Sequence, residues 1–112
     1  MKATLDHVGV AVRGLSEAIA FYRDALGLEV SEPADVPTDR VRAVFVPVGD
    51  ASIELLEPTA PDSALARSIE RRGEGLHHIT LAVDDLTAAL AQLKVVGRTP
   101  NHACASANSR YS

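Results

Sequence analysis

A chain of 112 residues, 46% of them hydrophobic and 23% charged, is long enough for one domain with a buried core and too short for two. A net charge of −4 without a basic stripe argues against a nucleic-acid partner, and no apolar stretch is long enough to cross a bilayer. The first residues show no export signal, so we expect a cytoplasmic protein with a small-molecule partner. Cys104 is the single cysteine and cannot form an internal disulfide.

Residues 6–12 alternate between two faces of a predicted strand. Its valines share the face that packs, whereas the opposite face carries His7 beside the small residues Gly9 and Ala11. A helix should follow, because apolar residues recur at helical spacing up to Gly27, the usual residue past a helix end. The expected buried stripe of this helix is Leu15, Ile19, Tyr22 and Leu26.

Three β-rich segments come next, separated by Pro, Gly and Asp turn signals. They are GLEVSE (27–32), VRAVFVPVG (41–49) and ASIELLEP (51–58), and the last two read as a hairpin turning at 48–51. A short connecting helix is then expected over 62–73, because Asp62 or Ser63 can cap its start and Gly73 can end it.

The sequence then repeats itself, because GLHHITLAVDDL at 75–86 matches TLDHVGVAVRGL at 4–15 with an offset of 78 − 7 = 71 residues. His7 falls on His78, and a second helix follows from about Asp85 to Val96. Its expected buried stripe is Leu86, Leu90 and Leu93. The prediction is an α+β fold of two paired βαβββ units in one domain, 1–97. The first unit covers 4–57, the connecting helix 62–73 and a partial second unit 75–97, and 98–112 forms an atypical tail of small polar residues.

His7 and His78 occupy equivalent places on equivalent strands, so a pseudo-twofold arrangement would point both imidazoles into one cleft. Glu54 lies in mid-strand between apolar residues, where a carboxylate is costly to bury unless it is paired or bound to a metal. Taken singly, each histidine could be structural and Glu54 could face water. Together, two nitrogens and one oxygen suit Mn, Fe, Co, Ni or Zn. His77 should lie on the opposite face from His78, in a structural or supporting role.

These segments resemble the methylmalonyl-CoA epimerases, a family of the vicinal oxygen chelate superfamily that also holds glyoxalase I and extradiol dioxygenases. The resemblance covers roughly positions 4–97 and rests mainly on DHVGVAV, FYRDALGLEV, IELLEP and GEGLHHI. It implies a glyoxalase-like fold and a divalent metal, cobalt first and Mn, Ni or Zn as alternatives, held by His7, Glu54 and His78. It also implies an acyl-CoA substrate, interconversion of its two epimers by proton abstraction beside the thioester carbonyl, and a homodimer.

The chain departs from the family pattern at its C-terminal end. A fourth metal ligand, the repeat partner of Glu54, would fall at 54 + 71 = 125, and no proton-transferring base can be assigned. Impaired activity is therefore one expectation. The alternatives are a metal-free small-molecule binding module of the same fold and a glyoxalase-like or extradiol dioxygenase-like enzyme. Basic residues are available for the phosphates of an acyl-CoA, although each could equally be a surface charge: Arg40, Arg42, Arg71 and Arg72.

Overall fold

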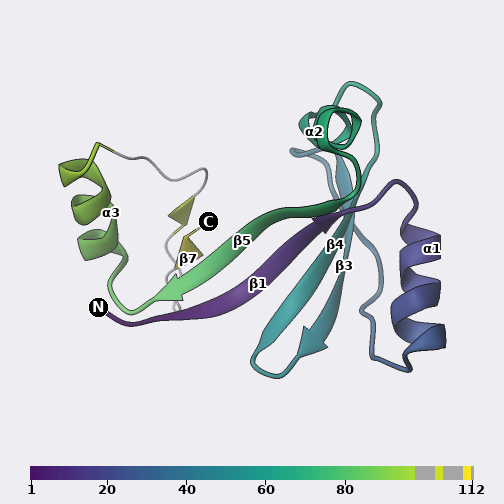
Figure 1. Cartoon of the computed structure of the whole chain (residues 1–112), viewed down its shortest axis with the longest axis horizontal. Coiled ribbons are helices and arrows are strands. Elements are labelled where there is room, and N and C mark those ends of the chain that lie inside the picture. Colours follow the sequence, from purple (N-terminus) through teal and green to yellow (C-terminus); the bar gives the residue numbers. More distant parts are fainter. Residues whose placement is uncertain (98–102, 105–109, 112) are drawn as a thin grey trace.

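The structure is a computed structural model that describes residues 1–97, 103–104 and 110–111. Figure 1 shows the course of the chain. Its elements are β1 (Ala3–Ala11), α1 (Leu15–Ile19), the π-helical segment η1 (Ala20–Ala25), β2 (Ala34–Val36), β3 (Val41–Val48), β4 (Ala51–Pro58), α2 (Ala64–Arg72), β5 (Gly75–Val83), α3 (Leu86–Val95), β6 (Ala103–Cys104) and β7 (Arg110–Tyr111).

The strands form one mixed sheet in the order β2-β3-β4-β1-β5-β7-β6. β1 lies at its centre, parallel to β4 on one side and antiparallel to β5 on the other. The two repeated strands are therefore direct neighbours, as Figure 1 shows. The first unit is a complete βαβββ arrangement and the second begins with β5 and α3, so the predicted α+β class is confirmed.

The sheet is packed on both faces. On one face, α1 covers a cluster formed by Leu15, Val44, Val46 and Leu55. On the other face, α2 covers a second cluster formed by Ala11, Val41, Ala43, Leu56, Leu65 and Ile69. Alternation along β4 explains the division, because Leu55 and Leu56 are consecutive and so point to opposite faces.

The connecting helix and the hairpin follow the predictions. Ser63 caps α2, its hydroxyl accepting a hydrogen bond from the Ala66 amide at 3.1 Å, and Gly73 ends the helix with φ 80°. The turn between β3 and β4 contains Gly49 at φ 58°, a conformation that favours glycine.

The predicted strand GLEVSE is wrong, because the second strand of the sheet is the three-residue β2 at 34–36. Ser31 explains part of the difference. Its backbone N–H donates to the Phe45 carbonyl at 2.9 Å, but its side-chain hydroxyl, rather than its carbonyl, accepts from the Phe45 amide at 2.8 Å. A side chain therefore replaces the backbone acceptor, and a regular ladder does not form at this point.

The first helix also differs from its prediction at its end. Leu26 is 53% exposed rather than part of the buried stripe. After Ile19 the helix widens to π geometry, and the Leu26 amide donates to the Phe21 carbonyl five residues back. One additional residue per turn rotates Leu26 away from the face that carries Leu15 and Ile19.

The second repeated helix is less buried than expected. α3 begins after Asp85, whose carboxylate accepts from the Ala88 amide at 2.9 Å, but none of its residues is fully buried and its leucines are half-buried. Most of the predicted tail lies outside the described residues, apart from the short strand β7, which pairs with β5, and the short strand β6, which pairs with β7. Among the described residues, no helix is both long and apolar enough to cross a membrane.

Candidate metal site

The three residues expected to bind a metal converge on one face of the sheet. His7 on β1, Glu54 on β4 and His78 on β5 each offer a ligand atom, and these atoms lie within 4.8 Å of one another. The Nε2 atoms of His7 and His78 are 3.4 Å apart. Oε1 of Glu54 lies 3.9 Å from Nε2 of His7 and 3.8 Å from Nε2 of His78. The side chains are only 16%, 17% and 23% exposed, in the order His7, Glu54, His78.

These distances fit a shared ion. Two ligands that each lie about 2.1 Å from one metal can be at most about 4.2 Å apart. All three separations fall below that limit, so one ion could contact the three atoms without a change of backbone. The nitrogen and oxygen donor set is the one that first-row divalent metals accept.

Gly9 is the centre of this arrangement. In the sheet it lies opposite Glu54 of β4 on one side and opposite His78 of β5 on the other. His7 is two residues earlier on the same strand and shares its face. A side chain at Gly9 would occupy the space of the His78 ring, so glycine allows the histidine to lie across β1.

Two register shifts in the β1–β5 ladder lie directly before the two histidines. Leu5 and His7 pair with the consecutive residues Leu81 and Thr80 of β5, so Asp6 is an extra residue in β1. In the same way, the consecutive residues Gly9 and Val10 pair with His78 and Leu76, so His77 is an extra residue in β5. An extra residue of this kind bends the strand and redirects side chains. Asp6 and His77 are equivalent in the repeat, since 6 + 71 = 77.

Each of these extra residues holds the histidine that follows it. Nδ1 of His7 lies 2.8 Å from Oδ2 of Asp6, and Nδ1 of His78 lies 2.9 Å from Nδ1 of His77. When Nδ1 of His7 donates to the carboxylate, its Nε2 carries no proton and can act as a metal ligand. The expectation that His77 would point away from His78 is therefore wrong, because the bulge breaks the alternation of β5.

A family comparison agrees with this geometry. The model of the glyoxalase/bleomycin resistance protein/dioxygenase superfamily matches residues 6–108. The chain belongs to this superfamily. The resemblance noted from the repeated segments is thereby confirmed.

Its relatives within the superfamily include methylmalonyl-CoA epimerases, which are isomerases. A mitochondrial methylmalonyl-CoA epimerase of Bos taurus is 42% identical over 91 residues, which cover 80% of this chain and 52% of that protein. An ethylmalonyl-CoA/methylmalonyl-CoA epimerase of Cereibacter sphaeroides is 40% identical over 98 residues, covering 87% and 73% respectively. The chain spans about half the length of the mitochondrial relatives that it matches.

Solved structures show the same likeness. A methylmalonyl-CoA epimerase of Streptomyces coelicolor in complex with 2-nitronate-propionyl-CoA superimposes with a TM-score of 0.76 and 30% identity. The match covers 88% of this chain and 73% of that one. The fold therefore agrees with the superfamily over most of the described residues.

The charge states of Glu54 and His78 are compatible with a bound cation. Burial raises the pKa of Glu54, opposed by His7, and the carboxylates of Asp39 and Asp6 raise it further. Burial lowers the pKa of His78, with His77 and His7 adding to the effect. The histidine is thus kept neutral, with a lone pair available for a metal. A divalent ion would offset the cost of the buried carboxylate.

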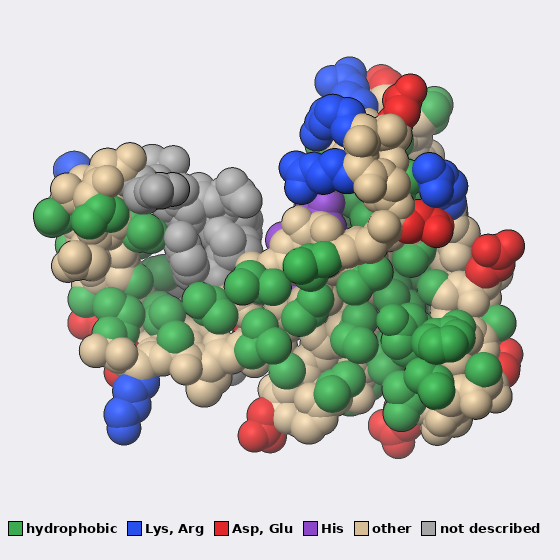
Figure 2. All heavy atoms as spheres, in the orientation of Figure 1, with side chains coloured by type: hydrophobic (Ala, Val, Ile, Leu, Met, Phe, Trp, Pro, Cys, Tyr) green, Lys and Arg blue, Asp and Glu red, His purple; other side chains and the backbone are tan. Residues whose placement is uncertain are grey.

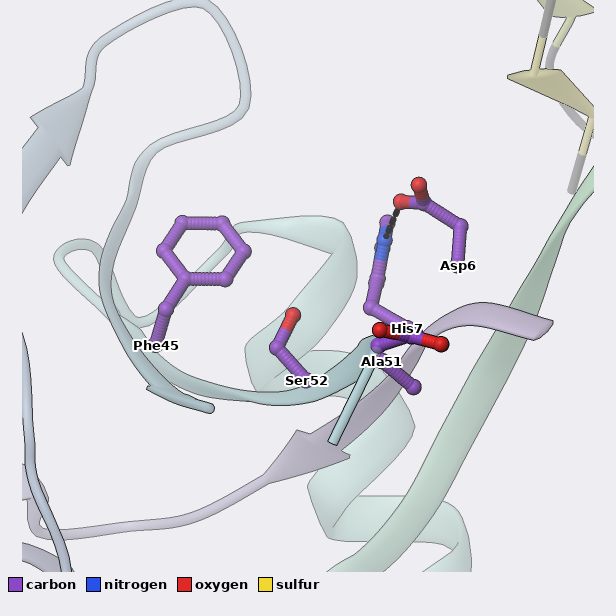
Figure 3. Close-up of a pocket in the computed structure, with 6 residues that line it drawn as sticks. Asp6, His7, Phe45, Ala51 and Ser52 are labelled. Atoms are coloured by element: carbon purple, nitrogen blue, oxygen red, sulfur yellow. Dashed lines mark hydrogen bonds and ion pairs between the residues drawn. The ribbon is translucent and has the colours of Figure 1, made fainter. Parts of the chain in front are cut away.

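A hollow of about 470 Å³ opens beside His7. It is lined by Asp6, His7, Phe45, Asp50, Ala51 and Ser52. In Figure 3, Asp6 and His7 face each other at one side of it and Phe45 forms the other. The ring of Phe45 meets that of His7 edge-on, with centroids 6.3 Å apart. This hollow gives a small ligand access to the edge of the candidate metal site.

Three residues of the site were not among the sequence predictions. Asp6 holds His7, Phe45 borders the hollow, and the hydroxyl of buried Thr80 lies 3.1 Å from Nε2 of His7. The sequence repeat contains a signal for Asp6. The offset of 71 residues aligns Asp6 with His77, and each is a polar residue directly before one of the two candidate histidines. No such signal marks Phe45 or Thr80.

Proposed function

We propose that this protein is a metal-dependent epimerase that interconverts (R)- and (S)-methylmalonyl-CoA, with cobalt as its metal and a homodimer as its assembly. The observation that carries the proposal is the convergence of His7, Glu54 and His78, from three different strands, within ligand distance of one point. Relatives named methylmalonyl-CoA epimerases support the choice of reaction and substrate.

The residues of the chain have distinct tasks in this proposal. His7, Glu54 and His78 hold the ion, while Asp6 and His77 keep the two imidazoles in the required tautomer and orientation. When bound, a divalent ion would act as a Lewis acid: by several kcal/mol it would stabilise the negative charge that develops on the thioester carbonyl oxygen as the neighbouring carbon transfers its proton to a base. The hollow beside His7 holds the acyl group, and Phe45 shields one side of it from water.

The proposal is tested by proton exchange at the epimerised carbon. The purified chain is loaded with cobalt, and deuterium uptake by methylmalonyl-CoA in D2O is followed by mass spectrometry. We expect exchange with the parent chain and none with His7→Ala or His78→Ala. Glu29→Gln is the matched control, because Glu29 is exposed and lies outside the site. A parent chain that binds cobalt and exchanges no proton would contradict the proposal.

A further inference from the structure

The arginines of α2 differ from Arg40 and Arg42 in having no ion pair among the described residues. Within residues 1–97, Arg40 pairs with Asp62 at 2.8 Å and Arg42 with Asp35 at 2.9 Å, so these two charges are already neutralised. Arg67, Arg71 and Arg72 are exposed and have no acidic partner among the described residues. Arg71 is four positions after Arg67, which places two like charges on one side of the helix at a small cost in stability.

The position of α2 connects these charges to the metal site. Leu65 and Ile69 of α2 pack against Ala11 and Leu56 of the sheet. Ala11 is four residues after His7 and Leu56 is two residues after Glu54, so both share the face that carries the metal ligands. The helix therefore covers the same face of the sheet, next to the site.

The basic end of α2 comes close to the histidines themselves. The helix leads through Gly73 into β5, which carries His77 and His78. Figure 2 shows Lys and Arg side chains gathered over α2 directly above the histidines. With three arginines and one acidic residue, Glu70, α2 thus carries a net positive charge beside the site, in a chain whose net charge is −4.

This inference rests on the proposed function and names the part of the substrate that the arginines of α2 bind. An acyl-CoA carries its reacting group at one end and its phosphates at the other, joined by an uncharged pantetheine arm. We propose that Arg67, Arg71 and Arg72 bind the phosphate groups of the acyl-CoA while its acyl end lies at His7, Glu54 and His78. Guanidinium groups suit this role because they match phosphate oxygens with paired donors.

The test separates the phosphates from the acyl group by using two probes. Calorimetry measures the affinity of cobalt-loaded chain for coenzyme A, which has the phosphates and lacks the acyl group. Steady-state kinetics use the N-acetylcysteamine thioester of methylmalonate, which has the acyl group and lacks the phosphates. The variants are Arg67→Gln, Arg71→Gln, Arg72→Gln and the triple variant. Arg23→Gln is the control for loss of an arginine away from α2, because Arg23 lies at an exposed position on η1 and pairs with Asp24 at 3.0 Å.

We expect each substitution in α2 to weaken coenzyme A binding by about three- to tenfold and the triple variant by more. The salt dependence of the affinity should fall with each arginine removed. The KM for the short thioester and the affinity for cobalt should not change, which also shows that the variants are folded. Equal coenzyme A affinity in the triple variant and Arg23→Gln would overturn the inference.

The remaining outcomes distinguish this inference from the proposed function. Coenzyme A binding that depends on α2, together with no proton exchange on either thioester, would retain the arginine site and reject the epimerase. Exchange on the short thioester by a chain that does not bind coenzyme A would retain the chemistry and reject the arginine site.

Discussion

Gly9 and His78 are in direct contact across two strands, with the imidazole lying over the glycine. A Cβ atom built at Gly9 would fall 2.7 Å from Nε2 of His78 and closer still to two other ring atoms. The backbone of Gly9 is not in the positive-φ region, so the requirement for glycine here is one of space. The position of His78, a proposed metal ligand, therefore depends on a residue that has no functional group.

Gly9→Ala should consequently weaken metal binding without unfolding the chain. The added methyl group displaces the His78 ring, and we expect cobalt affinity measured by calorimetry to fall by at least about tenfold, as for other losses of ligand positioning. Gly14→Ala is the control, because no atom lies within 4 Å of a Cβ at that position. Unchanged cobalt affinity in Gly9→Ala would contradict the placement of His78.

Asp6→Asn tests the support given to His7. The amide oxygen can still accept from Nδ1 of His7, but the negative charge that increases the basicity of the ring is lost. We expect cobalt affinity to fall by about 10- to 100-fold. Asp50→Asn removes a charge from the same hollow and should change the affinity much less. Similar losses in both variants would show that the effect is general electrostatics rather than orientation.

The central part of the site could be predicted from the repeat. Equivalent strands place equivalent histidines near one axis, and a mid-strand carboxylate between apolar residues indicates a group with a partner. The convergence of His7, His78 and Glu54 can therefore be predicted from the sequence. So can a helix cap at Asp62 or Ser63, of which the structure shows Ser63, and the hairpin turn at 48–51.

The features that could not be predicted depend on register. A bulge is visible only once two strands are paired, so the roles of Asp6 and His77 do not follow from alternation along one strand. The widening of the first helix at η1, which exposes Leu26, similarly depends on a change of hydrogen-bond pattern that apolar spacing does not reveal. The hydrogen bond from the Phe45 amide to the Ser31 hydroxyl, which replaces a backbone acceptor, is likewise visible only in the folded chain.

Glu57 should contribute to the attachment of α1. Its Oε2 accepts a hydrogen bond from the amide of Leu15, the first residue of the helix, at 2.8 Å. The carboxylate satisfies a free amide and lies at the positive end of the helix. We expect Glu57→Ala to lower the free energy of unfolding by about 1 kcal/mol, measured by urea denaturation. Glu29→Ala, at an exposed position, should have little effect, and an equal loss there would exclude the capping role.

Glu54 should be a residue that lowers stability when no metal is bound. Its pKa is raised in the folded chain, chiefly by burial, so the charged form is disfavoured there. Protonated Glu54 therefore favours the folded state. Its contribution to the free energy of unfolding is fully present below the ordinary glutamate pKa of 4.5 and is lost as the pH rises through the raised pKa of the folded chain. At neutral pH with chelator, Glu54→Gln should therefore unfold at a temperature several degrees higher than the parent, for a gain of about 1 kcal/mol.

The dependence on pH and on metal separates this effect from a change in packing. Below the ordinary glutamate pKa of 4.5, both chains carry a neutral side chain at position 54 and should melt together. Cobalt should reverse the order at neutral pH, because binding stabilises the parent more than a variant that has lost a charged ligand. Thermal unfolding followed by circular dichroism measures all three conditions.

A Glu54→Gln chain that melts below the parent at neutral pH without metal would show that the carboxylate stabilises the fold. In that case Glu54 would be better explained by structure than by metal binding.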